Sequence, residues 1–269
     1  MININMSDVE IKIIKGTRGD AFKNFLAQVL KRSNIRKTTI DKILDEEGMA
    51  MYDMAFTHKT ADEVKNYEYL ELMGDSLVNA CIVGYLNERF PKLRTPEGVK
   101  IIARLKINLI SKKSFCDFAA KLNMWEFVTA DEDVKTTKMK KTLEDVFEAF
   151  FGATSLLVNS KIKSNSGYNI CYNIIKSLFN EIEISLKYED LYDAKTRLKE
   201  TMDLHKEAGI LKYENERIEN IQYVKVSLIR PDRRFVFLGK GSAALKPDAE
   251  QKAAAMAIET LRTRMNILN

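Results

Sequence analysis

Histidine and cysteine are scarce in this sequence, which excludes several kinds of site. The 269 residues include two histidines, His58 and His205, and three cysteines, Cys81, Cys116 and Cys171. Two distant histidines argue against a Ser-His-Asp triad and against a histidine-rich zinc centre. An odd number of widely spaced cysteines in apolar surroundings argues against a disulfide framework and is typical of reduced thiols. We therefore expect an intracellular, cytoplasmic protein.

Long apolar runs and helix-breaking residues are also few. No run of about 18 apolar residues occurs, so we expect no transmembrane span and no membrane partner. The first residues lack a basic segment followed by an apolar core, so we expect no secretory signal. Only 4 prolines and 11 glycines interrupt the chain, which favours helix. With 45% hydrophobic and 30% charged residues, the sequence is typical of a globular protein with a sizeable core.

Charge is distributed unevenly along the chain. The formal net charge is +5, and the segment from Asp193 to Asn269 contains 15 basic and 11 acidic residues, a net charge of +4. The preceding residues therefore carry only +1. A basic C-terminal module that follows a nearly neutral, acid-containing segment indicates a polyanionic partner.

Acidic residues recur at helical spacing within residues 66–78. Glu68, Glu71 and Asp75 stand at positions i, i+3 and i+7, among apolar residues. On a helix these three carboxylates share one face, where like charges repel each other. A helix has no structural reason to line up like charges, so the spacing favours a cationic ligand.

A second segment, residues 142–153, has the same character. Asp145 and Glu148 stand at i and i+3 among valine and phenylalanine residues. Each acid could instead be a solvated residue on an amphipathic helix, since charged residues are mostly exposed. If the two helices converge, their five carboxylates require a cation, and oxygen-only ligands suit Mg²⁺, for which Mn²⁺ can substitute. The spacing alone leaves both interpretations open.

Three segments resemble motifs of the ribonuclease III family. Residues 68–76, Glu-Tyr-Leu-Glu-Leu-Met-Gly-Asp-Ser, resemble its signature E-x-L-E-F-L-G-D-S. Residues 145–153 resemble its second motif, D-x-x-E-A-x-x-G-A, in the expected order and at about the expected separation. Residues 55–60, Ala-Phe-Thr-His-Lys-Thr, resemble the segment A-[FL]-T-H-[RK]-S that precedes the signature in this family.

The resemblance implies roles for individual acids. It implies that four carboxylates ligate the metal, directly or through water: Glu71, Asp75, Asp145 and Glu148. Glu68, Asp75 and Glu148 would be the catalytic residues. Glu68 and Glu97 would orient metal-bound water or the ligands. Glu97 is assigned from Glu97-Gly98, which resembles the E-G that opens the next helix in the family, although two residues are inserted after it here.

The resemblance also implies a homodimer with one cleavage centre per subunit. In relatives, a phenylalanine after the second acid of the signature packs into the partner. Here that position is Leu72, followed by Met73. Both are apolar, so we expect these two residues to form a dimer contact that is smaller than usual.

Several basic residues and one histidine lie outside the acidic motifs. Residues 104–113 resemble the family segment L-R-x-x-L-V-S-N-x-x-L-A, in which we expect Lys106 and Lys112 to contact RNA. His58 has no neighbouring nucleophile, so we expect it to be a hydrogen-bonded structural residue. A charged loop is expected over residues 131–141, and its lysines could be solvated or could contact phosphate near the metal: Lys135, Lys138, Lys140 and Lys141.

The C-terminal module reads as helix, three strands, helix. Strand-like alternation covers residues 211–217, 222–230 and 234–241, and an alanine-rich helix covers 249–265. The motifs D-x-K-T-x-L-x-E, G-x-G-S and A-E-Q-x-A-A resemble a double-stranded RNA-binding domain, which contacts successive minor grooves and the phosphates between them. The resemblance implies RNA contacts by six residues: Lys195, Thr196, Lys199, Glu200, Lys246 and Lys252.

Two departures from that family should weaken RNA binding. Relatives carry a Lys-Lys pair before the second helix, whereas residues 242–249 are two residues longer and contain one lysine, Lys246. The loop after the first strand reads Ile-Glu-Asn-Ile at 218–221 instead of Gly-Pro-x-His. Loss of one or two phosphate contacts would flatten the salt dependence of binding by about one or two units of slope.

The sequence thus predicts a mainly α protein, with an all-helical ribonuclease III domain followed by a small α+β (α-β-β-β-α) double-stranded RNA-binding domain. The expected boundaries are a flexible N-terminal extension, the endonuclease domain, a linker and the RNA-binding domain: 1–20, 21–187, 188–192 and 193–269. The expected activity is Mg²⁺-dependent hydrolysis of double-stranded RNA without an organic cofactor, leaving 5′-phosphate and 3′-hydroxyl ends with short 3′ overhangs. The alternative is a non-cleaving protein that binds or sequesters double-stranded RNA. Such relatives usually lose signature acids, which this chain keeps; an additional acid, Glu144, has no role in either interpretation.

Overall fold

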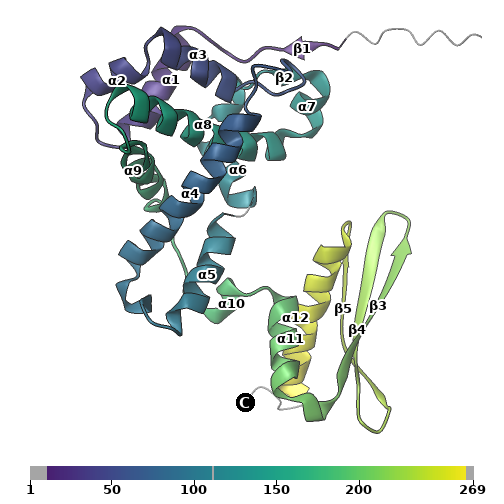
Figure 1. Ribbon diagram of the computed structural model, residues 1–269. Helices are drawn as coiled ribbons and strands as arrows, with labels where there is room; N and C mark the ends of the chain where they lie inside the picture. Colours follow the sequence, from purple (N-terminus) through teal and green to yellow (C-terminus); the bar gives the residue numbers. More distant parts are fainter. Residues whose placement is uncertain (1–10, 111, 265–269) are drawn as a thin grey trace, which may run out of the picture. The chain divides into compact units, whose positions relative to one another are not determined.

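A computed structural model describes residues 11–110 and 112–264 of the chain (Figure 1). The chain forms two compact units, Met1–Ile184 and Ser185–Asn269. The first is helical, and the second combines helices with a three-stranded sheet. Across the described residues, no helix has both the length and the apolar character needed to cross a membrane.

Nine α-helices make up most of the described part of the first unit. Their bounds are α1 (Asp20–Lys31), α2 (Lys37–Ile43), α3 (Glu46–Ala55), α4 (Glu68–Arg89), α5 (Gly98–Leu109), α6 (Lys112–Lys121), α7 (Glu132–Thr137), α8 (Met139–Lys161) and α9 (Gly167–Phe179). Two short 3₁₀ helices, η1 (Pro91–Leu93) and η2 (Met124–Phe127), lie in the connections. Two short strands, β1 (Ile13–Ile14) and β2 (Ala130–Asp131), pair antiparallel.

Helix α8 is the centre of this unit. From Thr142 to Thr154 every residue except Glu144 is buried. A helix that is apolar on nearly all sides has to be surrounded by other helices, and α4, α6 and α9 pack against it (Figure 1). Phe147 joins α8 to α6 through stacked contact with Phe115 at a centroid distance of 5.2 Å.

The acidic helix is long and uninterrupted. Helix α4 continues without a break from Glu68 to Arg89, through the apolar run that begins at Cys81. Gly74 and Gly84 lie inside it, and a glycine weakens a helix by only about 1 kcal/mol relative to alanine. Packing of its apolar residues against α8 and α9 outweighs that cost.

The lysine-rich segment after β2 is also more ordered than expected. Instead of a charged loop over 131–141, the chain forms α7 and the first turn of α8. Asp131 caps α7, because its carboxylate accepts a hydrogen bond of 2.8 Å from the Val134 backbone N–H. Val134 is fully buried and anchors this short helix to the core.

The described part of the expected flexible extension is attached to the first unit. Strand β1 pairs with β2, and a Cβ atom at Gly16 would lie 2.2 Å from the Phe127 carbonyl oxygen. The Arg18 guanidinium forms an ion pair with Asp53 and donates to Thr129 Oγ1 at 3.0 Å. Hydrogen bonding and close packing therefore attach residues 13–18 to the first unit; residues 1–10 of the expected extension lie outside the described residues.

The second unit has the expected α-β-β-β-α order, which is confirmed. Its elements are α10 (Tyr188–Leu191), α11 (Ala194–Leu204), η3 (Lys206–Ala208), β3 (Ile210–Ile218), β4 (Ile221–Ile229), β5 (Phe235–Ala243) and α12 (Lys246–Arg264). The Asp193 side chain caps α11 by accepting a hydrogen bond of 2.9 Å from the Thr196 N–H. The segment expected to be a linker, residues 188–192, contains α10, with Leu191 buried.

The sheet is antiparallel in the order β3-β4-β5, and its core packs against α11 and α12. Val224, Val226 and Leu228 of β4 point into this core together with alanines of α12. Gly239 lets α12 approach β5 closely, because a Cβ atom there would lie 2.5 Å from the Ala253 carbonyl oxygen. The strands β3 and β4 are joined by only two residues, Glu219 and Asn220.

Candidate active site

The two acidic segments meet where α4 crosses α8. A Cβ atom at Gly74 would lie 1.8 Å from the Glu148 carbonyl oxygen, and one at Gly152 would lie 2.1 Å from the Leu70 carbonyl oxygen. The two backbones are therefore almost in contact, and only glycine permits this distance at either position. This crossing brings the carboxylates of the signature beside those of the second motif.

Glu148 lies at the centre of the acidic cluster. Its side chain is buried in α8, and burial together with the nearby charges of Asp75, Glu144, Glu71 and Asp145 raises its pKa to about 8. Neighbouring negative charges can raise a pKa in this way only at short range. The structure therefore brings together all four residues expected to ligate a metal.

Glu71 belongs to the same cluster. Burial and the charge of Asp145 raise its pKa to about 7, while Lys141 acts in the opposite direction. At neutral pH, Glu71 and Glu148 therefore both titrate, which places the site between two charge states. A bound cation would favour the fully ionised state.

Tyr67 is a member of this site that the motif did not reveal. Its hydroxyl donates a hydrogen bond of 3.0 Å to Asp145 Oδ2, and both side chains are buried. Its pKa is raised strongly by burial and by Asp145, so the phenol stays protonated and remains a donor. The sequence feature that could have indicated Tyr67 was its position directly before Glu68, as an aromatic residue in a mostly charged and polar stretch.

The two remaining signature acids lie at the edge of the cluster. Glu68 is the first residue of α4, and its carboxylate pairs with the Lys59 ammonium at 2.5 Å. It still contributes to the raised pKa of Glu71. Asp75 accepts a hydrogen bond of 2.8 Å from the side-chain amide of Asn79. Both acids are exposed, so either could contact a ligand from solvent.

Glu97 is not brought to the cluster within one chain. It directly precedes α5, in the segment after η1 that follows the C-terminal end of α4. Asp75 lies 14 positions before the end of α4, which corresponds to about 21 Å along the helix. Glu97 is also absent from the charges that raise the pKa values of Glu71 and Glu148. Its role as an orienting residue stays a prediction.

The donor set fits a hard divalent cation in its chemistry. All four candidates are carboxylates, and the charges of neighbouring carboxylates raise the pKa values of Glu71 and Glu148. Among residues 11–110 and 112–264, no group of three or more His, Cys, Asp or Glu side chains is already arranged to hold a metal ion. Metal binding would therefore require these side chains to turn toward a common point.

His58 has the structural role expected of it. The ring Nδ1 of His58 accepts a hydrogen bond of 3.1 Å from the Thr60 backbone N–H, and the backbone N–H of His58 donates to the Thr129 carbonyl at 2.8 Å. Its ring meets Tyr67 edge to face at 5.5 Å. Burial lowers the pKa of His58, so the ring is neutral. This ring supports the position of Tyr67.

The lysines of the α7 region divide between two roles. Lys135 donates to the Val128 carbonyl at 2.8 Å and lies 4.4 Å from the Trp125 ring, so it is a structural residue. Lys138 pairs with Asp133 at 2.9 Å. Lys141 lies near enough to Glu71 to lower its pKa. Of these three, Lys141 is the one near the acidic cluster.

The candidate RNA-contacting residues differ in their exposure and in whether they already have a partner within the protein. Lys106 is half-buried on α5, and the side chain of Lys112 lies outside the described residues. In the second unit, Lys195 pairs with Glu250 at 2.6 Å, and Lys252 donates to the Ser242 carbonyl at 2.9 Å. These two amines have protein partners already.

The other candidates in the second unit lie on α11 and at the start of α12. The Thr196 hydroxyl donates to Asp193 at 2.8 Å, and Glu200 accepts a hydrogen bond from the Tyr188 hydroxyl. Lys199 on α11 and Lys246 at the start of α12 are exposed. These two lysines are therefore the better placed to contact phosphate.

The residues expected at a dimer contact are exposed apolar side chains. Leu72 is 66% exposed and Met73 is 40% exposed, although both lie on a helix of the core. Exposed apolar residues next to each other are typical of an interaction site. Their exposure fits the expected contact.

Comparison with known proteins places these features in a family. Residues 68–158 match the ribonuclease III domain. A ribonuclease 3 homologue of Invertebrate iridescent virus 6 is 40% identical over 267 residues, which cover 94% of this chain and 91% of that protein. Ribonuclease 3 of Ligilactobacillus salivarius is 26% identical over 88% of this chain and 98% of that protein. The nuclease domain of ribonuclease III from Campylobacter jejuni, a solved structure, is 23% identical with a TM-score of 0.45, covering 60% of this chain and 97% of that one. The chain belongs to the ribonuclease III family.

Proposed function

We propose that the protein is an endoribonuclease that hydrolyses phosphodiester bonds in double-stranded RNA with the help of Mg²⁺. The observation that carries this proposal is the meeting of four carboxylates at the crossing of α4 and α8: Glu71, Asp75, Asp145 and Glu148. Such a concentration of negative charge would repel RNA unless cations intervened. The family relationship supports the same conclusion.

The four carboxylates would hold the ion, directly or through water. When bound, a divalent ion would offset the negative charge of the phosphate, activate a water molecule and stabilise the leaving oxygen. Tyr67 would hold Asp145 in place through its hydrogen bond. Glu68 would orient water at the edge of the site, after release from Lys59.

The products would carry 5′-phosphate and 3′-hydroxyl ends. We propose that the protein acts as a homodimer through Leu72 and Met73, with one cleavage centre per subunit cutting one strand. Two cuts displaced across the duplex would leave short 3′ overhangs. The second unit would contact the duplex with exposed lysines such as Lys199 and Lys246.

The structure adds a reason to expect modest affinity from the second unit. The turn between β3 and β4 has only two residues, of which Glu219 is acidic, so it offers little to a minor groove. Lys195 and Lys252 are already paired within the protein. The nuclease unit would then contribute much of the duplex binding.

One experiment tests this proposal. A long RNA duplex is incubated with the parent protein, with and without Mg²⁺, and the product ends are sequenced. Glu148→Gln should abolish cleavage, a loss of at least about 10³-fold, and should leave duplex binding within about twofold. Glu63→Gln, which removes the same charge from an exposed loop position, is the matched control and should cut like the parent.

The result also separates cleavage from the alternative of a non-cleaving RNA-binding protein. If the parent binds the duplex but cuts it at no Mg²⁺ or Mn²⁺ concentration, the protein is a binder or a sequestering protein. If Glu148→Gln cuts as fast as the parent, the assignment of the metal ligands is wrong.

A further inference from the structure

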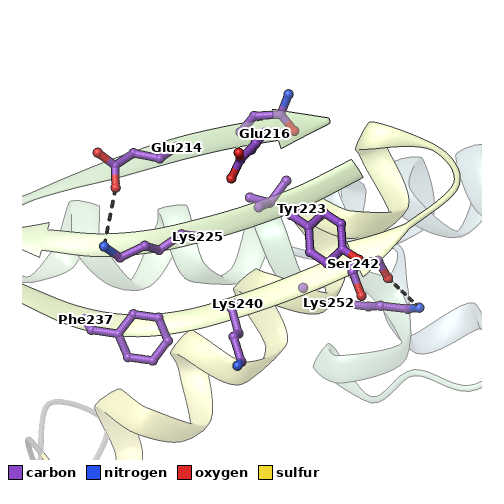
Figure 2. Close-up of a pocket in the computed structure, with 11 residues that line it drawn as sticks. Glu214, Glu216, Tyr223, Lys225, Phe237, Lys240, Ser242 and Lys252 are labelled. Carbon is purple, nitrogen blue, oxygen red and sulfur yellow. Dashed lines mark hydrogen bonds and ion pairs between the residues drawn. The ribbon is translucent and has the colours of Figure 1, made fainter. Parts of the chain in front are cut away.

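The outer face of the three-stranded sheet carries side chains that the proposed function does not use. Successive strand residues point to opposite faces, and one face packs against α11 and α12. Tyr223 and Lys225 on β4 and Phe237 and Lys240 on β5 lie on the other face (Figure 2). A bulge at Leu238, which the register omits, keeps Phe237 and Lys240 on the same face although they are three residues apart.

These side chains line a groove of about 690 Å³. The groove runs over β4 and β5, with Tyr223 toward one end and Phe237 toward the other (Figure 2). Phe237 pairs across the strands with Ser227, four residues from Tyr223, so the two rings are separated by about 13 Å along β4 at 3.3 Å per residue. This length accommodates a short extended chain.

Both rings are accessible to solvent. Tyr223 is 41% exposed and Phe237 is 43% exposed. A flat ring that faces solvent can stack on a nucleobase, and every base offers a suitable face. In a duplex these base faces are already stacked on each other, so the rings suit unpaired bases.

Two lysines stand directly opposite each other between the rings. Lys225 and Lys240 are register partners on β4 and β5, so their Cβ atoms are about 5 Å apart. Like charges in this position repel and destabilise a sheet. Among the described residues, the positive charge of Lys225 is paired only with Glu214, at 3.6 Å. The Lys240 ammonium has no ion pair with any described residue. An anion over this pair would relieve the repulsion.

The acids of the groove determine where that anion can lie. Glu214 and Glu216 are both on β3, at the edge of the sheet (Figure 2). They would repel a phosphate over β3 and favour a path over β4 and β5. The groove therefore has basic and aromatic side chains over β4 and β5 and acidic side chains over β3.

We propose that this groove binds single-stranded RNA, with bases stacked on Tyr223 and Phe237 and phosphates held by Lys225 and Lys240. The proposal concerns a site separate from the acidic cluster and does not depend on cleavage. Single-stranded RNA could reach it as a free strand or as the unpaired end of a duplex, and both present the same bases and phosphates.

The test is a fluorescence-anisotropy titration of the full-length protein in EDTA, so that no cleavage occurs. The probes are a twelve-nucleotide single strand, a blunt duplex and the same duplex with a 3′ overhang. Phe237→Leu should weaken single-strand binding about fivefold or more, whereas Phe237→Tyr, which keeps the ring, should bind like the parent. Lys240→Gln should lower the slope of log K against log salt by about 0.7 for the single strand.

A control on the other side of the sheet completes the design. Lys199→Ala on α11 should weaken binding of the blunt duplex and spare the single strand. If the overhang raises the affinity for the duplex and Phe237→Leu removes that increase, the groove binds the unpaired end of a duplex. If the overhang does not raise the affinity, the groove binds a free single strand. The proposal is overturned if the parent does not bind the single strand, or if Phe237→Leu binds it as well as the parent does. It is also overturned if Phe237→Leu changes the sedimentation coefficient and not the RNA affinity, because the groove would then be a contact between copies of the chain.

Discussion

At the scale of single residues, the carboxyl groups of the acidic cluster are held in an unfavourable environment. Burial and mutual repulsion raise the pKa of Glu71 to about 7 and that of Glu148 to about 8. Acids in the unfolded chain titrate near 4.3. The folded protein therefore holds extra protons between these values, and it loses stability when they dissociate.

This difference predicts a pH dependence of the free energy of unfolding in EDTA. Because the folded pKa values are higher, stability should be fully retained below about pH 4 and should fall as the pH rises toward 8. At about 1.4 kcal/mol per pKa unit, Glu148 alone would contribute on the order of a few kcal/mol. Urea unfolding at pH 5 and pH 8 measures the change.

The matched comparison for this prediction is Glu148→Gln. It should show a smaller loss of stability between pH 5 and pH 8 than the parent does. Adding Mg²⁺ at pH 8 should stabilise the parent and have less effect on the variant. Identical pH profiles for the two proteins would refute the placement of Glu148 among the other acids.

A second prediction at this scale concerns Tyr67→Phe, which removes the hydrogen bond to Asp145. Loss of a buried hydroxyl partner should cost about 1 kcal/mol of stability. Because an orienting partner of a metal ligand is lost, the affinity for Mn²⁺ should fall about tenfold or more. Electron paramagnetic resonance of bound Mn²⁺ measures this without any RNA.

Tyr52→Phe is the control for that measurement. The Tyr52 hydroxyl is fully buried and bonds to Thr154 at 2.8 Å, so its partner is a threonine and not one of the candidate metal ligands. It should cost a similar amount of stability and leave Mn²⁺ affinity unchanged. Equal losses of Mn²⁺ affinity in both variants would mean that Tyr67 has only a packing role.

At the scale of elements, the site depends on how closely α4 and α8 approach. Gly74 and Gly152 face the backbone of the opposite helix, so neither position has room for a side chain. The apolar residues of α8 make this approach favourable, because nearly all of them are buried against neighbouring helices. The crossing that gives the core its close packing also brings the acids together.

We therefore predict that Gly74→Ala destabilises the protein. The new methyl group would lie 1.8 Å from the Glu148 carbonyl oxygen, so the helices would have to separate. Overpacking of this kind costs about 1–3 kcal/mol or more, and Mn²⁺ affinity should fall as well. Thermal unfolding followed by circular dichroism measures the stability.

Gly84→Ala, in the same helix, is the control. There the nearest atom is the Tyr168 hydroxyl, at the flexible end of a side chain, so the strain can be relieved. This variant should be neutral or slightly stabilised, because alanine favours helix over glycine. If Gly74→Ala and Gly84→Ala both unfold at the same temperature as the parent protein, α4 and α8 do not approach each other as closely as described.

At the scale of the whole molecule, the proposed homodimer predicts a concentration-dependent assembly. The parent should sediment as a dimer at micromolar concentration. Leu72→Glu should shift it to a monomer, because a charge would be buried in the contact. Analytical ultracentrifugation measures both states.

Val64→Glu provides the control, since Val64 is 87% exposed and lies in a loop outside α4. It should leave the dimer intact. A parent that sediments as a monomer, or a Leu72→Glu variant that stays dimeric, would rule out this contact.

The features of this protein that could be predicted from the sequence are those that depend on residues close together in the chain. The acid spacing within each motif and the strand alternation of the second unit depend on neighbours in sequence, and both were readable there. The continuation of α4 through Gly84 and the attachment of residues 13–18 were not readable. Both depend on packing against segments distant in sequence, which outweighs local preference.

The sequence by itself determined which acids are present, on which faces of which helices, and the order of elements in the second unit. Only the tertiary structure decided that Asp75 and Glu148 meet, that Tyr67 supports Asp145, and that Glu97 lies beyond the far end of α4. The reason is physical: spacing fixes the direction of a side chain around its own helix. Where two helices cross is determined by which backbones can touch, and that is known only once Gly74 and Gly152 face each other.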